Sequence, residues 1–138
     1  MSDRRGAAAS TERTGAATTE RWREKVVPLA DLAKIRQQFR DRTIVLCHGA
    51  FDLVHMGHLI HFEDARALGD LLVVTITADK HITKKRAVSM REDFRAQQVA
   101  SLEIVDYVAI VDEPSAVAAI EALRPDVYVK GPEYSNLL

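Results

Sequence analysis

The feature that most constrains the fold is a regular alternation of short apolar runs and helical patterns. The apolar runs lie at residues 43–47, 71–77, 107–111 and 127–129. Short continuous apolar runs are typical of strands that are covered on both faces. Strands that alternate with helices at this spacing indicate a parallel sheet with helices on both sides. We therefore predict an α/β fold, a Rossmann-like doubly wound parallel sheet in three α/β/α layers.

Four helices are expected around these strands, at residues 29–39, 57–68, 89–102 and 114–123. The first precedes the first strand, and Pro28 stands where a first-turn proline is tolerated. The second should stop at Gly69, a residue suited to a left-handed helix cap. The third should open on a capping box, because Ser89 and Glu92 have the required spacing.

The first 27 residues lie outside this alternation and are predicted to form a disordered tail. Residues 1–19 are mostly Ala, Ser, Thr, Gly and Arg without hydrophobic periodicity. Such a segment buries too little apolar surface to offset its ordering entropy. Asp3, Glu12 and Glu20 interrupt the acid-poor pattern of a transit peptide. We therefore expect one domain at residues 28–138.

The distribution of charge argues against a nucleic-acid partner. Residues 1–42 carry 10 Lys and Arg against 6 Asp and Glu, whereas residues 43–138 carry 9 against 14. A domain that binds a nucleic-acid backbone usually shows a basic face, and this body is acidic. No apolar run reaches the roughly 18 to 20 residues of a membrane span. With a single cysteine, Cys47, the chain is expected to be cytoplasmic, without a membrane partner.

The segment after the first strand concentrates unusual residues: His48-Gly-Ala-Phe-Asp-Leu-Val-His55-Met-Gly-His58. Ligands of parallel sheets bind at the carboxyl ends of the strands. Gly49 permits close backbone approach there, and Gly57 begins a helix whose N-terminal N–H groups favour phosphate. His55 and His58 can converge on one anion and stabilise the charge that develops during in-line displacement. This pattern predicts nucleotidyl transfer.

The histidines also permit a metal-site interpretation. His61 lies one helical turn after His58 and could join His48 as a ligand. The phosphate interpretation explains His55 and His58 without a metal, so we expect no metal bound by the protein. In that case His61 belongs to a partly exposed helix face, and Cys47 is a small core residue.

The pattern H-G-x-F-D-x-x-H-x-G-H at residues 48–58 resembles the signature of the cytidylyltransferase-like nucleotidyltransferase superfamily. The similarity extends over roughly residues 43–134. It includes Thr77-Ala-Asp79, Phe94-Arg-Ala-Gln-Gln-Val99 and Val129-Lys-Gly-Pro-Glu-Tyr134. The last segment is similar to the K-G-x-[DE]-Y element of the heptose-phosphate adenylyltransferase branch, which is related to glycerol-3-phosphate cytidylyltransferase.

The resemblance implies a Mg²⁺-dependent reaction of a nucleoside triphosphate with a sugar phosphate or polyol phosphate, with release of pyrophosphate. ATP is the favoured nucleotide, and CTP remains open. The implied catalytic residues are His55, His58, Lys85 and Arg95. The implied nucleotide-binding residues are Gly49, Ala50, Phe51, Gly57, Asp79, Lys130, Gly131 and Glu133. Relatives suggest a homodimer that acts in carbohydrate metabolism.

Three of these assignments have alternatives. Lys85 is preferred to its two basic neighbours only because of its spacing from Asp79. Asp79 could cap a loop instead of orienting a substrate or metal. Arg91 competes with Arg95 for the phosphate-binding role.

The end of the sequence leaves a second function open. The family carries a further Ser/Thr-rich turn, well beyond the K-G-x-[DE]-Y element, that grips the triphosphate. The 138 residues end four positions after Tyr134. We therefore expect the domain to lack this turn, and the alternative function is a truncated, non-catalytic nucleotide-binding module.

Overall fold

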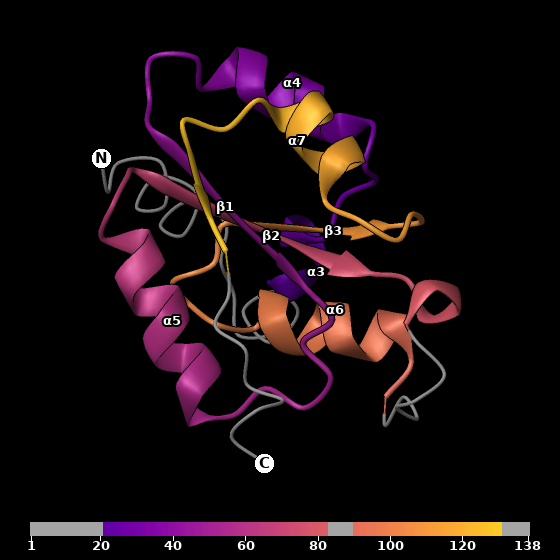
Figure 1. Cartoon of the computed structure of the whole chain (residues 1–138). Coiled ribbons are helices and arrows are strands. Elements are labelled where there is room, and N and C mark those ends of the chain that lie inside the picture. Colours follow the sequence, from indigo (N-terminus) through magenta and orange to yellow (C-terminus); the bar gives the residue numbers. More distant parts are fainter. Residues whose placement is uncertain (1–20, 83–89, 131–138) are drawn as a thin grey trace.

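A four-stranded parallel sheet lies at the centre of the computed structural model, which describes residues 21–82 and 90–130 (Figure 1). The strands are β1 (Ile44–Gly49), β2 (Leu71–Thr77), β3 (Tyr107–Val111) and β4 (Val127–Val129). Their order is β3-β2-β1-β4, and every neighbouring pair is parallel. The predicted α/β, Rossmann-like class is confirmed, and three of the four strands have their predicted bounds.

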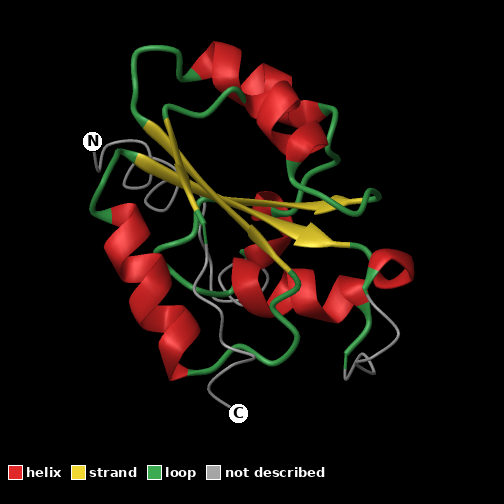
Figure 2. Ribbon diagram, in the orientation of Figure 1, coloured by secondary structure: helices red, strands yellow, loops and turns green. Residues whose placement is uncertain are grey.

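Helices cover both faces of this sheet (Figure 2). They are α3 (Trp22–Lys25), α4 (Asp31–Gln38), α5 (Met56–Arg66), α6 (Glu92–Ala100) and α7 (Val117–Leu123), with a short 3₁₀ turn, η1 (Asp79–His81). Helices α4 and α7 lie on one face, and α3, α5 and α6 lie on the other (Figure 1). Within the described ranges, no helix is long and apolar enough to cross a membrane.

The side chains of β1 alternate between two hydrophobic cores. Ile44 and Leu46 pack on the side of α4 and α7, whereas Val45 and Cys47 pack on the side of α5 and α6. All four are fully buried. Because both faces of β1 are buried, apolar residues are favoured at every position, and the strand is a continuous apolar run in the sequence.

The end of α5 differs from the prediction. Helix α5 ends at Arg66, and its C-cap Ala67 has right-handed backbone angles. No glycine among the described residues has a positive φ, so the expected left-handed cap at Gly69 is wrong. A Cβ at Gly69 would approach the Thr43 carbonyl oxygen and Val45 Cγ2 to 2.7 Å. Gly69 therefore serves the close approach of this turn to β1.

The start of α6 also differs from the prediction. The helix begins at Glu92, its N-cap is Arg91, and the Arg91 side chain makes no capping bond. The expected capping residue Ser89 lies outside the described residues. Glu92 Oε1 accepts a hydrogen bond from the backbone N–H of Asp79 (2.8 Å), so its carboxylate serves a contact with η1.

The C-terminal part of the predicted tail, residues 21–27, is ordered and differs from the prediction. Helix α3 lies here, and Trp22 and Val26 pack against the core on the α5 and α6 side. Val26 forms a parallel bridge with Val108, and the N–H of Val27 donates to the Val108 carbonyl (2.8 Å). This segment covers the edge of β3, which would otherwise expose unpaired backbone groups. Residues 1–20 lie outside the described residues.

An aspartate precedes each of β2, β3 and β4 and bonds to the neighbouring strand. The pairs are Asp70 with Thr43, Asp106 with Leu72, and Asp126 with Ile44. In each pair the carboxylate accepts the backbone N–H of its partner at 2.8 Å, and the backbone N–H of the aspartate donates to the carbonyl of that partner. These reciprocal pairs set the register of the strands and thereby the relative positions of their carboxyl ends.

We expect Asp106→Ala to lower the free energy of unfolding by about 2 kcal/mol, because it leaves the N–H of the fully buried Leu72 without its acceptor. The Asp106 carboxylate also lies 3.5 Å from Arg66 Nε. Urea unfolding measures the change. Asp106→Asn keeps an oxygen acceptor and should lose less. An unchanged midpoint in the alanine variant would contradict the register role.

Candidate functional site

The signature segment, which follows β1, has a strained backbone. Phe51 and Leu53 have positive φ angles of 51° and 73°, which residues with a side chain rarely adopt. The Phe51 ring lies edge-on to His58 (5.5 Å between centroids) and tilted against Phe62 (5.1 Å). A Cβ at Gly49 would lie 3.0 Å from this ring. Gly49 therefore allows the Phe51 ring to pack over the end of β1.

His55 and His58 cap the N-terminus of α5 in a reciprocal arrangement. His55 is the N-cap, and its Nδ1 accepts the N–H of Gly57 (3.0 Å). His58 Nδ1 accepts the N–H of His55 (3.1 Å), and the centroids of the two rings lie 4.1 Å apart. A neutral imidazole that accepts at Nδ1 carries its hydrogen at Nε2. The backbone thus selects the tautomer in which each ring has an Nε2–H donor.

His55 and His58 lie side by side, and their capping role was not anticipated. The sequence placed both residues at the start of a helix. Histidine is not a common capping residue, so the pattern carried no signal for the contacts that fix their tautomers.

His48 is tied into the sheet. Its Nδ1 lies 2.8 Å from Thr75 Oγ1 and its Nε2 lies 3.3 Å from Thr77 Oγ1, both on β2. Burial lowers the pKa of His48, which keeps the ring neutral. In the part of the chain that the structure describes, no three His, Cys, Asp or Glu side chains are grouped to hold a metal.

Two further residues of this region are buried. His61 was expected on a partly exposed face, but it is only 9% exposed and is one of the buried residues of α5. Burial lowers the pKa of His61, and Asp64 opposes this shift. Cys47 is fully buried, and burial raises the pKa of its thiol to about 12, which excludes a thiolate nucleophile.

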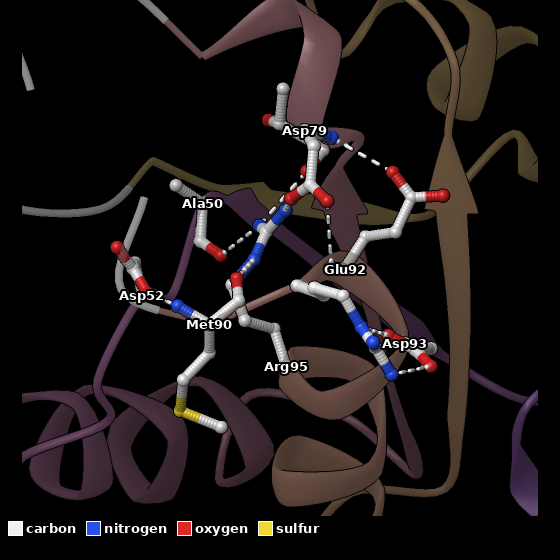
Figure 3. A network of polar contacts seen from close by, with 9 residues as sticks. Ala50, Asp52, Asp79, Met90, Glu92, Asp93 and Arg95 are labelled. Carbon is white, nitrogen blue, oxygen red and sulfur yellow. Dashed lines mark hydrogen bonds and ion pairs between the residues drawn. The ribbon is translucent and has the colours of Figure 1, made fainter. Parts of the chain in front are cut away.

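Arg95 is fully buried and bonds to oxygens of the chain itself (Figure 3). Its guanidinium donates to the carbonyls of Met90 (3.0 Å), Ala50 (2.7 Å) and Thr77 (2.9 Å), and to Asp79 Oδ1. A buried charge is tolerated when it is paired and fully hydrogen-bonded in this way. These contacts were not predicted, and they show that the Arg95 guanidinium is held by oxygens of the chain; the predicted contact of Arg95 with a phosphate stays a prediction.

Asp79 completes this network. Its Oδ2 accepts the N–H of Glu92 (3.2 Å), and its own N–H donates to Glu92 Oε1 (2.8 Å). Asp52, inside the signature, accepts the N–H of Met90 (3.0 Å) (Figure 3). Asp79 thus has the capping role that was the alternative interpretation. Together these contacts, called here the Arg95 network, fasten the signature segment to η1 and to the start of α6.

The remaining predicted residues are distributed around this edge. Gly57 is the second residue of α5, and Lys130 is exposed directly after β4. Arg91, the competitor of Arg95, is exposed, pairs with Asp93 (3.2 Å) and stacks over Phe94. Lys85, Gly131 and Glu133 lie outside the described residues. The structure thus joins Ala50, Asp79 and Arg95 in one network, beside the histidine pair at the start of α5.

Comparison with known proteins places this chain in a family. A family model described as cytidylyltransferase-like matches residues 46–136. A protein of Helicobacter pylori (strain HPAG1) named bifunctional protein HldE is 40% identical over 116 residues, which are 81% of this chain and 25% of that protein. The HldE protein of Syntrophotalea carbinolica is 38% identical over 110 residues, 78% of this chain and 22% of its own length.

A solved structure shows the same arrangement of elements. It is described as the lipopolysaccharide core biosynthesis protein from Thermoplasma volcanium GSS1, and it is 25% identical with a TM-score of 0.59. The match covers 63% of this chain and 72% of that chain. The chain spans about a quarter of the length of the HldE relatives that it matches. The similarity therefore concerns one part of those bifunctional proteins.

Proposed function

This chain belongs to the cytidylyltransferase-like family of nucleotidyltransferases, and from that membership we propose that it transfers a nucleotidyl group to a sugar phosphate or polyol phosphate. An oxygen of the acceptor phosphate attacks the α-phosphorus of a nucleoside triphosphate, and the bond to the leaving pyrophosphate breaks. The similarity to HldE proteins and to a lipopolysaccharide core biosynthesis protein supports a sugar phosphate such as a heptose phosphate. It also favours ATP over CTP.

The observation that carries this proposal is the histidine pair at the start of α5. The two rings lie 4.1 Å apart between centroids there, and backbone contacts at Nδ1 select the tautomer that carries its hydrogen on Nε2. A helix N-terminus adds partial positive charge at the same place. Donors that are fixed before the reaction stabilise charge on phosphoryl oxygens without a reorganisation cost. We assign His55 and His58 to the triphosphate.

The other residues of the site have supporting roles in this proposal. We assign the backbone groups of Ala50 and Phe51 to the phosphates, and Lys130, Gly131 and Glu133 to the nucleotide. We assign Lys85 to the acceptor phosphate or the departing pyrophosphate. Arg95 acts through the Ala50 carbonyl and Asp79, and so holds the signature segment in place.

The described residues do not form a magnesium-holding set. The carboxylates of the signature and of η1 already accept hydrogen bonds: Asp52 from Met90, and Asp79 from Glu92 and Arg95. Mg²⁺ prefers several oxygen ligands in octahedral geometry and is usually bound together with substrate phosphates. We therefore propose that Mg²⁺ enters as part of the nucleotide substrate.

Release of pyrophosphate tests the proposed function. We expect the chain to release pyrophosphate when it is incubated with Mg²⁺, ATP and a heptose or hexose 1-phosphate, and to release none without an acceptor. CTP and glycerol 3-phosphate are the alternative substrates. Nucleotide binding without release for any acceptor would contradict the transferase proposal and would support the non-catalytic module.

A further inference from the structure

The two central strands change from apolar to polar residues at their carboxyl ends. Residues 44–47 of β1 and 71–74 of β2 are all apolar and fully buried. His48 follows on β1, and Thr75 and Thr77 follow on β2. The Cα atoms of His48 and Thr75 are partners in the register of the two strands. Packing of the sheet does not require this change, because apolar residues serve the same strands up to this point.

The imidazole of His48 joins the three polar side chains into one hydrogen-bonded group, called here the His48 cluster. Its Nδ1 lies 2.8 Å from Thr75 Oγ1, and its Nε2 lies 3.3 Å from Thr77 Oγ1. Both threonines are buried, so their hydroxyl groups need a partner within the chain. A neutral imidazole donates at one nitrogen and accepts at the other, and each threonine hydroxyl can do either. A buried polar group that is satisfied in this way favours one arrangement of the chain.

The His48 cluster shares a residue with the Arg95 network. The guanidinium of Arg95 donates to the Thr77 carbonyl (2.9 Å) and to the Ala50 carbonyl (2.7 Å). Side chains alternate along a strand, so His48 lies on the same face as Leu46, the face of α4 and α7. Arg95 belongs to α6, which covers the opposite face. The ends of β1 and β2 are therefore held together from both faces of the sheet.

The backbone that follows His48 needs such support. Phe51, three residues later, has a φ of 51°, which is unfavourable for a residue with a side chain. Backbone strain of this kind persists only where the surrounding structure fixes the chain on several sides. Arg95 holds the carbonyl of Ala50 from one side, and His48 fixes the end of β1 from which the segment departs.

Other roles for His48 fit less well. A direct contact with a phosphate would cost an existing bond, because each ring nitrogen already faces a threonine hydroxyl. A metal site lacks ligands, since no three His, Cys, Asp or Glu side chains are grouped in residues 21–82 and 90–130. Stability alone is a weak reason, because apolar groups of the same shape in place of bonded polar partners can be nearly neutral or stabilising.

We propose that His48 is a positioning residue of the transfer site: its bonds to Thr75 and Thr77 fix the end of β1, and thereby the backbone of Ala50 and Phe51 that is assigned to the phosphates. This inference rests on the proposed function and adds to it a residue that acts without touching the substrate.

Steady-state pyrophosphate release by the full chain tests the effect on the reaction. His48→Phe keeps a ring and removes both nitrogens. We expect kcat to fall about tenfold, because displaced phosphate-binding groups fit the transition state less well. The KM for the nucleotide should change less than about threefold, because the histidine pair at the start of α5 is unaltered. His48→Asn keeps a polar group near the position of Nδ1, and so the shorter contact with Thr75, and should recover part of kcat.

Thr43→Val is the matched control, because Thr43 directly precedes β1 at its opposite end. The substitution also replaces a polar group by an apolar one of similar size, and kcat should be unchanged. Thr75→Val removes the bond to His48 from the other strand. It should not lower kcat further in a His48→Phe background, because the two substitutions remove the same interaction.

Hydrogen exchange followed by NMR gives a second readout that does not depend on activity. Two backbone N–H groups donate to carboxylates: Met90 to Asp52 of the signature (3.0 Å), and Leu72 to Asp106 at the opposite end of the sheet (2.8 Å). In His48→Phe we expect exchange at Met90 to become faster by a larger factor than exchange at Leu72. The first reports local opening of the signature, and the second reports the stability of the sheet.

An unchanged kcat in His48→Phe, beside an active wild type, would overturn the inference. It would also be overturned by unaltered exchange at Met90, or by equal acceleration at Met90 and Leu72, since the loss would then be one of overall stability. If the wild type releases no pyrophosphate with any acceptor, the proposed function is wrong. The exchange measurement then decides by itself whether His48 holds the signature segment.

Discussion

Replacing His55 or His58 with alanine is expected to lower kcat by about 100-fold or more. Each substitution removes an Nε2–H donor whose tautomer is fixed by the backbone. The donor stabilises negative charge that develops on the phosphoryl oxygens in the transition state. Loss of the donor should therefore lower kcat more than nucleotide affinity. Steady-state pyrophosphate release at saturating nucleotide measures the effect.

A stability control separates this effect from loss of the helix cap. His55→Ala removes an N-cap acceptor and should cost about 1 kcal/mol of unfolding free energy. His55→Asn keeps a side-chain oxygen that can accept the Gly57 N–H and should recover most of that loss. It should recover little of kcat, because the asparagine amide does not reach the position of Nε2. Full activity in His55→Asn would show that capping alone is the role of His55.

Arg95→Met is expected to lower the free energy of unfolding by about 3 to 5 kcal/mol, the range seen when one partner of a buried ion pair is removed. Three carbonyls and the Asp79 carboxylate would lose their donor. This is the largest stability effect that we expect at the site. Urea unfolding followed by circular dichroism measures it.

Arg91→Ala is the matched control for Arg95, because Arg91 lies one helical turn away and is exposed. It should change the unfolding free energy by less than about 0.5 kcal/mol. Arg95→Lys keeps the charge but not the planar fork that reaches several oxygens at once, so it should restore only part of the stability. If Arg95→Met has the unfolding free energy of the wild type and only its affinity for the nucleotide or the acceptor phosphate falls, the positioning role is wrong.

The strands could be predicted closely, because burial on both faces leaves an uninterrupted apolar run in the sequence. Their order and pairing could not be read in this way. Asp70, Asp106 and Asp126 bond to the neighbouring strands, but in the sequence they look like ordinary turn residues. The helix at Trp22 was missed for a similar reason. Its four residues are too few to show periodicity, and they are ordered by packing on the core.

The histidine pair was predictable because both residues lie within one short segment. The Arg95 network was not, because Arg95 and Ala50 are 45 positions apart and arginine is usually a surface residue. The resemblance singled out Arg95 and Asp79, but it did not indicate that the two bind each other. Their contacts with each other and with the backbone became evident only in the fold.

Titration of the purified chain with ATP and with CTP, each with Mg²⁺, tests the central claim most directly. The proposed site predicts saturable heat with one nucleotide, with ATP favoured, and clearly weaker binding in a His55→Ala His58→Ala variant that remains folded. Equal binding by the wild type and this variant, or no binding of either nucleotide, would contradict a triphosphate site at the start of α5.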